Sequence, residues 1–540
     1  MSASTASRIF LALLLTALGA LSAAATVPSG TQLAKQQVLN RGNGNEPETL
    51  DPARARSDAA LQLARDLYAG LTGESPAGEV VPAVADRWHV SDDGTEYTFH
   101  IRANARWSNG KPLTAGDFVY AWRRAVDPKT GSPYADTFAV IANGPAIVGG
   151  KADPATLGVS ASDAHTLKVK LHAPAPYFLD MLTEPVMFPV YRPAIKKYGD
   201  AFTRPGHSVT NGAYELADWV VNSKITLTRN PYYWDNAHTV IDTVNYLPIT
   251  DEASELDRYR AGGLDVTYTI PEAQLGWIRS HLAGELHIAP YLSTYFYGFN
   301  SSRPPFKDNP KLRQALSMAI DRSVIATKIL HAGEQPAYGF VPPGMSNYIT
   351  QRFAWAGWPR DKRLARARAL YREAGYSTEK PLHVTIMYNT GDVHQRIAQA
   401  IAAMWKANLG VDAQLVNEEF KVFLQDRQEM RTTQIFRSGW VADYNDAYSF
   451  LQILLGDNGI NDTGYNSAEY DRLMHEASRQ QDSAKREALL ERAERVMLAD
   501  NPIMPVYFYV SKHLVKPYVG GWHDNGLDHH YTKDLYIRAH

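Results

Sequence analysis

The chain has 540 residues, with 55 Lys and Arg against 57 Asp and Glu, and this net charge of −2 argues against nucleic acid or an anionic membrane as a partner. It contains no Cys, which excludes disulfides, thiolate metal sites, a Cys nucleophile and an acylated N-terminal Cys. Its 30 Tyr, 17 Phe and 11 Trp favour a roomy site for a polar organic ligand, although most individual rings are expected to fill cores.

The N-terminal residues predict a secretory signal peptide. Arg8 supplies a positive n-region, and residues 9–21 form an apolar stretch that is too short for the roughly 20 residues needed to span a bilayer. The small residues 22–25 then offer a cleavage site. We therefore expect residues 1–25 to be a signal peptide, the mature chain to begin near Thr26, and the protein to be soluble and periplasmic because it lacks a lipid-anchored Cys.

The N-terminal part of the mature chain predicts short strands interspersed with helices. Ser57-Asp58 is suited to cap a helix, Thr114 and Asp117 resemble a capping box, and Asn309-Pro310 opens a further helix. The alternation of apolar and polar residues predicts strands over residues 36–41, 97–101, 167–171 and 225–228.

From about residue 360 the pattern changes to alternating helices and strands. Strands are predicted over residues 382–388 and 411–416, and the helix between them ends at Gly410. This order is a βαβ unit, so a parallel sheet is expected there. A later helix over residues 489–496 precedes a strand over 506–510. The mature chain, of roughly 515 residues, is too long for one core, and we predict a mixed α/β protein with more than one sheet.

Motifs of common enzymes are absent from the sequence. It has no P-loop, no GxGxxG after a strand, no HExxH and no GxSxG. The adjacent pair His529-His530 makes a poor chelate, because neighbouring residues of a strand point to opposite sides, and we expect two surface histidines. We predict no enzyme activity, no metal site and no cofactor. An exported hydrolase stays open as an alternative, because many hydrolases lack local signatures.

Characteristic segments follow one another in order from near residue 36 to the C-terminus. They read EPETLDP at 46–52, ARWSNGKP at 105–112, TNGAY at 210–214, NPYYW at 230–234, ADYN at 442–445 and VKPYVGG at 515–521. Together they resemble the peptide/nickel class of bacterial solute-binding proteins, and within it the periplasmic oligopeptide-binding proteins of ABC importers. The resemblance implies an oligopeptide ligand, membrane permease subunits as partners, and a monomer.

The resemblance also implies the three-lobed solute-binding protein fold, in which two large α/β lobes close on the ligand by hinge motion and a smaller lobe is inserted. The βαβ region found from periodicity falls in the last of these lobes. The implied boundaries are residues 26–68, 194–292 and 511–540 for lobe I, 69–193 for lobe II, and 293–510 for lobe III.

A peptide zwitterion enclosed between lobes I and III needs a partner for each charge, because an unpaired buried charge is costly. By resemblance, Asp443 binds the ammonium group, and Arg437, Arg427 and His394 meet carboxylates at different distances. The peptide backbone is expected to pair, as an added strand, with Trp440-Val441 on lobe III and with Arg56-Ser57 on lobe I. The side chains expected to line the site are Tyr134, Tyr291, Phe296 and Phe420.

Four departures from the family pattern involve five positions. Leu330 stands where a Lys is expected, Phe420 replaces a Trp, and Arg56 occupies a position that is acidic in well-known members. Ser293 and Val441 stand where some members carry a disulfide. These departures leave open a narrower ligand, namely a murein tripeptide, a dipeptide or an oligosaccharide, although Asp443 argues against a sugar because a sugar brings no amine. An exported holdase is compatible with the peptide role.

Overall fold

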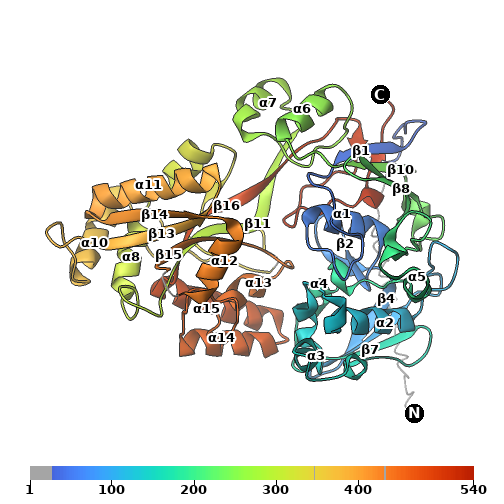
Figure 1. Cartoon of the computed structure of the whole chain (residues 1–540), viewed down its shortest axis with the longest axis horizontal. Coiled ribbons are helices and arrows are strands. Elements are labelled where there is room, and N and C mark those ends of the chain that lie inside the picture. The colour runs from blue at the N-terminus through green and yellow to red at the C-terminus, as the bar shows by residue number, and fades with distance from the viewer. Residues whose placement is uncertain (1–26, 346, 431–432) are drawn as a thin grey trace, which may run out of the picture.

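The computed structural model describes residues 27–345, 347–430 and 433–540. The predicted signal peptide lies outside these residues. Figure 1 shows two bodies, one holding the described chain as far as β10 (Thr243–Leu247) together with the C-terminal end, the other holding most of the remaining chain. Two long strands, β11 (Leu286–Phe299) and β16 (Ile503–Leu514), run from one body to the other (Figure 1).

One sheet of the first body joins the start of the chain to its middle. β1 (Val38–Gly42) pairs in parallel with β10 (Thr243–Leu247), which continues through β9 (Lys224–Arg229) to β8 (Tyr214–Val220). The inward residues of these strands share a core with α1 (Asp58–Leu67), whose predicted cap is confirmed because the Ser57 hydroxyl accepts a hydrogen bond from the Ala60 amide.

A second sheet of the same body is antiparallel and has the order β4 (Ala85–Val90), β5 (Glu96–Ile101), β7 (Thr166–Lys170) and β6 (Val159–Ala161). Helix α2 (Ala115–Val126) packs on it through Phe118 and Trp122. The predicted capping box is confirmed, because the Asp117 carboxylate accepts from the Thr114 amide at 2.8 Å.

The second body is built on a six-stranded mixed sheet. Its order is β12 (Gln335–Pro336), β16, β11, β15 (Ile435–Val441), β13 (His383–Asn389) and β14 (Asp412–Glu418). β13 and β14 are parallel and are joined by α11 (Asp392–Leu409), which ends at Gly410 in the left-handed region, so the predicted βαβ unit is confirmed. The main helices packed around this sheet are α8 (Pro310–Ala319), α10 (Arg360–Glu373), α12 (Phe420–Glu429), α14 (Ala468–Arg479) and α15 (Ser483–Asp500).

The two crossing strands are paired with each other where they connect the bodies. β11 and β16 pair antiparallel from Leu286↔Leu514 to Gly298↔Ile503, with a register shift between Pro290 and Thr294. A shift of register interrupts the ladder, which marks the place where the pair bends most easily. Lys512 on β16 lies 2.7 Å from Glu272 and 2.7 Å from Glu334, and these two carboxylates precede and follow β11 in the chain.

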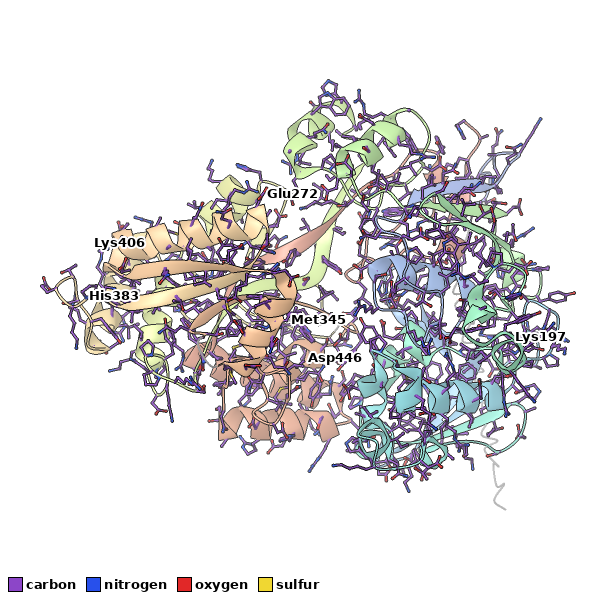
Figure 2. All side chains as sticks on the ribbon, viewed as in Figure 1. Lys197, Glu272, Met345, His383, Lys406 and Asp446 are labelled. Atoms are coloured by element: carbon purple, nitrogen blue, oxygen red, sulfur yellow. The ribbon has the colours of Figure 1, made fainter. Side chains whose placement is uncertain are left out.

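The bodies touch a second time, far along the chain from the crossing strands. Tyr177, from the first body, stacks between Tyr444 and Tyr448 of the second, with ring centroids 5.1 and 5.0 Å apart. Asp446 lies where the bodies meet (Figure 2) and holds Arg486 through a bond of 2.8 Å from Nη2. We call the three stacked rings the tyrosine contact.

The division into lobes I, II and III remains our proposal, and the sheets support it. The first sheet and the chain ends come from the ranges proposed for lobe I, the second sheet from those of lobe II, and most of the mixed sheet from lobe III. The proposed boundaries after residues 292 and 510 fall inside β11 and β16, next to the register shift. The predicted mixed α/β architecture with several sheets is confirmed.

Candidate ligand-binding site

Two cavities are lined by residues predicted to belong to the site. One, of about 300 Å³, belongs to the second body and is lined by residues that include Phe296, Arg427 and Trp440. The other, of about 240 Å³, lies beside the crossing strands and is lined by residues that include Asp58 and Tyr291. Four of the predicted site residues, Phe296, Arg427, Trp440 and Tyr291, therefore border space that a ligand can enter, and both walls mix polar and aromatic groups.

Asp443 follows directly on the end of β15. Its amide donates to the Ser449 hydroxyl at 2.9 Å, and that hydroxyl lies 3.4 Å from Oδ2, so the start of the next helix fixes the carboxylate. Water reaches the side chain, yet surrounding protein atoms displace much of its hydration, and this burial together with the Glu184 carboxylate raises the pKa of Asp443 to about 7. A carboxylate held in this way favours a cationic partner.

The first body contributes an acidic and a phenolic side chain, Glu184 and Tyr134, to the surroundings of Asp443. Glu184 repels negative charge on Asp443, and Arg65 donates to Glu184 at 3.3 Å. Burial, Glu184 and Asp443 raise the pKa of Tyr134, which shows that this predicted lining residue faces the same group of carboxylates. The region therefore carries more negative than positive charge and is suited to an ammonium ion.

The last residues of β15 form an unpaired sheet edge. β15 pairs with β11 along its whole length, from Ile435↔Phe299 to Val441↔Ser293. On its other side it pairs with β13 only at Ile435 and Phe436. From Arg437 to Val441 one side of the strand is therefore free to accept an added strand, as predicted for Trp440-Val441. The directly opposed Ser293 and Val441 also occupy cross-strand positions suited to the disulfide that some family members carry there.

Arg437 is a cation whose partners are neutral. Its guanidinium lies within 3.3 Å of the Asn389 amide oxygen and of the Tyr509 hydroxyl, and it lies over the Tyr295 ring at 4.9 Å. No carboxylate lies within ion-pair distance of it in the described part of the chain. Its charge is therefore available to a ligand carboxylate.

Arg427 and His394 were also predicted to offer a positive charge to a ligand carboxylate, and in the structure neither has an unpaired positive charge. Arg427 already forms an ion pair with Asp462, at 2.6 Å, so a ligand carboxylate would have to compete for it. Burial, assisted by the Arg437 charge, lowers the pKa of His394 to about 4, so His394 is neutral near pH 7 and offers a hydrogen bond in place of a charge. Of the three predicted cations, Arg437 alone combines a positive charge with neutral partners.

The Arg56-Ser57 segment is also occupied in part. Both amides and the Ser57 hydroxyl donate to the Glu48 carboxylate, at 2.7 Å from the Arg56 amide and 3.0 Å from the Ser57 amide. The Ser57 carbonyl accepts from the first turn of α1. A peptide strand could pair with both residues here only if Glu48 moved away, because its oxygens use the donors that such a strand needs. The Arg56 guanidinium is exposed.

The side chains predicted to line the site lie in different surroundings in the structure. Phe296 is buried in the mixed sheet and contributes to the wall of the larger cavity, against Phe340 at 5.3 Å. Tyr291 on β11 lines the smaller cavity, and burial raises its pKa. Leu330 is buried, so the position expected to hold a Lys is apolar and points into a core. Phe420 begins α12, but its side chain lies outside the described residues.

Sequence reasoning missed three residues of this site and misplaced two. Glu184, Asp462 and Tyr509 approach Asp443, Arg427 and Arg437 from distant parts of the chain, and no local pattern marks them. The expectation that His529 and His530 are surface histidines is wrong. The two side chains are 17% and 5% exposed and bond to Glu74 and Asp528, because the segment is irregular and not a strand.

Comparison with known proteins places the chain in one family. Residues 79–462 match the family of bacterial extracellular solute-binding proteins, family 5 Middle, and the chain belongs to that family. Members of such families bind solutes and are not enzymes. No helix among the described residues has the length and apolar character needed to cross a membrane.

Two curated relatives and two solved structures cover nearly the whole chain. The periplasmic oligopeptide-binding protein OppA of Escherichia coli is 43% identical over 97% of this chain and 96% of its own, and the probable deoxycholate-binding periplasmic protein YgiS of Escherichia coli is 42% identical over 96% of each. The unliganded open form of the murein tripeptide-binding protein MppA is 40% identical, with a TM-score of 0.85 over 95% of this chain and 99% of that one. Haemophilus influenzae OppA in complex with RPPGFSPFR is 38% identical, with a TM-score of 0.77 over 94% and 100%.

Proposed function

We propose that this protein captures oligopeptides in the periplasm and delivers them to an ABC-type importer of the inner membrane. The observation that carries the proposal is the arrangement along β15, where Arg437 begins and Asp443 follows a sheet edge that is free on one side. A peptide added to this edge would offer its ammonium to Asp443 and a carboxylate to Arg437, while its backbone bonds to the strand.

The spacing of the two charged groups suits short peptides. Arg437 and Asp443 are six residues apart, and at about 3.3 Å per residue of strand their Cα atoms are at most about 20 Å apart. The Arg side chain reaches back along this distance by several ångström, so ligands of roughly three to five extended residues match the separation. Water in the adjoining cavities would accommodate different side chains.

Periplasmic location and delivery to a permease rest on the family. The relatives named above are periplasmic by their descriptions, and the N-terminal residues of this chain have the pattern of a signal peptide. N-terminal sequencing of the chain from a periplasmic fraction tests the location, with a start near Thr26 expected and an intact Met1 in the cytosol as the contrary result.

Narrower ligands are the competing proposals. The MppA and YgiS descriptions name a murein tripeptide and deoxycholate, and a dipeptide or an oligosaccharide would also fit the cavity sizes. A bile acid or a sugar has no ammonium, so it would leave Asp443 without a partner, which favours a peptide. An exported hydrolase lacks support from the family.

Native mass spectrometry of purified protein, followed by calorimetry, tests the assignment. We expect co-purified peptides of a few residues, and binding of tripeptides and tetrapeptides that is lost when the amino end is acetylated. Tight binding of deoxycholate with no binding of any peptide would overturn the proposal, and cleavage of added peptide would favour the hydrolase.

A further inference from the structure

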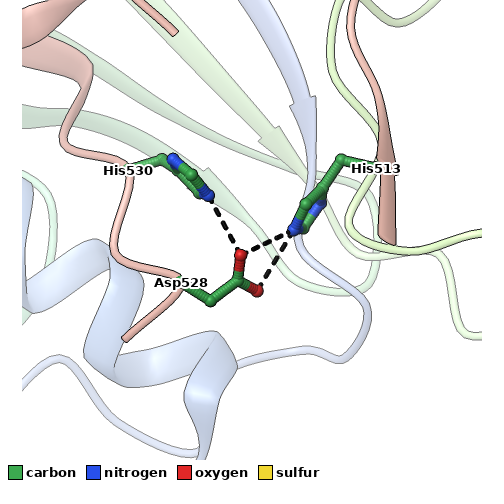
Figure 3. Close-up of side chains that lie close together, drawn as sticks. All are labelled: His513, Asp528 and His530. Atoms are coloured by element: carbon green, nitrogen blue, oxygen red, sulfur yellow. Dashed lines mark hydrogen bonds and ion pairs between the residues drawn. The ribbon is translucent and has the colours of Figure 1, made fainter. Parts of the chain in front are cut away.

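A cluster at the smaller cavity, made of residues that are not among those proposed to bind the peptide, joins three potential metal ligands. His513 lies on β16, and Asp528 and His530 lie in the C-terminal segment that follows it (Figure 3). His513 Nε2 lies 2.9 Å from Asp528 Oδ1, and His530 Nε2 lies 3.0 Å from the same oxygen. The potential ligand atoms of all three side chains lie within 4.8 Å of one another.

The surroundings of His513 orient its ring as in a metal site. Nδ1 lies 3.1 Å from the carbonyl oxygen of Thr267, and because a carbonyl only accepts, Nδ1 carries the proton. Nε2 faces the Asp528 carboxylate, to which it donates when the ring is charged, and a metal ion bound to Nε2 would take the place of that proton. A histidine that ligates a metal through one nitrogen while donating from the other to a carbonyl has this arrangement.

The distances fit a small divalent ion. With Zn–N of about 2.0–2.1 Å and Zn–O of about 2.0–2.2 Å, neighbouring ligand atoms of a tetrahedral site are about 3.3 Å apart. The two nitrogen–oxygen distances to Asp528 are 2.9 and 3.0 Å, so an ion requires each of them to open by a few tenths of an ångström. The histidine nitrogens lie within 4.8 Å of each other, so the two rings must also settle at the tetrahedral separation. Two imidazoles and one carboxylate form a ligand set that Zn²⁺ and its neighbours in the transition series prefer.

The cluster is both held in place and accessible. The His530 ring stacks on Trp522 with centroids 3.8 Å apart, which fixes the ring before any ion binds. His513 and Asp528 line the cavity of about 240 Å³ beside the crossing strands, which provides an entry path and room for water at a fourth position. One nearby group opposes binding, since the Arg41 guanidinium donates to the His530 carbonyl at 2.8 Å and adds positive charge.

We propose that His513, Asp528 and His530 bind one divalent transition-metal ion of the Zn²⁺ type, with an open coordination position on the cavity side. The ion would tie the end of β16 to the segment that follows. That segment also holds the other crossing strand, because the Gly526 carbonyl accepts from the Leu292 amide at 2.7 Å. The bound metal would therefore stiffen the junction where both strands enter the first body.

The test titrates Zn²⁺ against a chromogenic chelator into the mature chain, without an affinity tag and after removal of metals, and repeats the titration with Co²⁺ for its visible spectrum. We expect one ion per chain, an intense tetrahedral Co²⁺ spectrum, and affinity lost by at least about a hundredfold in Asp528→Asn and in His530→Gln. The matched control is His523→Gln, an exposed histidine in the same segment, which should bind as wild type does.

Three results would overturn the proposal. The first is that the wild type binds no stoichiometric ion. The second is that the wild type, Asp528→Asn and His530→Gln bind the ion with equal affinity. The third is that only His523→Gln loses the ion. In each case the cluster is a hydrogen-bonded network only. Circular dichroism and peptide binding check that the variants fold, and His530→Gln carries the test if Asp528→Asn does not, because His530 lies on an irregular segment with fewer bonds. Peptide affinity is measured separately, so failure of this site leaves the proposed function intact.

Discussion

Peptide affinity should depend on pH through Asp443. With its pKa raised to about 7 in the unliganded protein, the carboxyl is half ionised near neutral pH. The ligand ammonium binds the ionised form, so binding must first remove the proton when the pH lies below this pKa. Affinity should therefore fall as the pH falls through this pKa, approaching tenfold per pH unit, and should fall again at higher pH where the peptide ammonium loses its proton.

The size of the effect follows from the ionised fraction. With a pKa of about 7, roughly three quarters of the carboxyls are ionised at pH 7.5 and about 3% at pH 5.5, so affinity should fall about 25-fold between these values. The ammonium of the peptide has an ordinary pKa of about 7.7–8.0, so it is fully protonated at pH 5.5 and roughly 60–75% protonated at pH 7.5, which reduces the expected ratio from about 25-fold to about 15- to 20-fold. Calorimetry in buffers of different ionisation enthalpy should also detect protons released on binding at pH 6.

Two variants separate Asp443 from its surroundings. Asp443→Asn should remove the pH dependence and weaken binding by roughly 3–5 kcal/mol, because the buried ammonium loses its partner. Glu184→Gln should keep the binding but move the midpoint to lower pH, because Glu184 is one of the causes that raise the pKa of Asp443. Wild-type affinity that stays within twofold from pH 5.5 to 7.5, or an unchanged midpoint in Glu184→Gln, would refute the reasoning.

Three further predictions concern other parts of the structure. Arg437→Gln should weaken peptides with a free carboxylate by at least about tenfold and amidated peptides little, whereas Arg427→Gln should have a smaller effect because Arg427 is already paired; calorimetry with both peptide forms checks this. Tyr177→Ala should remove stacking of about 0.5–1.5 kcal/mol per ring pair and increase the radius of gyration in solution scattering, and an unchanged radius would contradict it. The double variant Ser293→Cys with Val441→Cys should form a disulfide across β11 and β15 on air oxidation, detected by thiol titration, and two persistent free thiols would count against the register.

Local features were predictable because the residues that determine them are adjacent in sequence. The Ser57 cap, the Thr114–Asp117 capping box and the glycine after α11 all follow from contacts within one helical turn. The βαβ unit followed from a change of periodicity over a few dozen residues. The full length of β11, by contrast, was not predicted, because its pairing partners lie more than a hundred residues away in β15 and β16.

In the candidate site, too, local features were predictable and tertiary contacts were not. Asp443 and Arg437 could be proposed as site residues because they lie in a segment that resembles the family. The residues that surround them could not be predicted, because they come from distant parts of the chain. That Arg427 is paired with Asp462, that Glu48 occupies the Arg56-Ser57 amides, and that His394 is neutral all depend on tertiary contacts. The histidines at 529 and 530 were misread for this reason, since a strand was assumed where the chain is irregular.

The two connections between the bodies determine how they can move. In Figure 1 the crossing strands lie above α4 (Phe178–Met181) and α13 (Tyr448–Leu451), which adjoin the tyrosine contact, and the two connections together define a line. While both connections hold, the only large motion left is rotation about that line, because sliding or twisting would separate the stacked rings. Points near an axis travel least, and Asp443 is the neighbour of Tyr444 in that stack. If the bodies rotate about this line, the carboxylate proposed to receive the ammonium would move little, and a ligand bound there would be enclosed as the far side of the second body turns toward it.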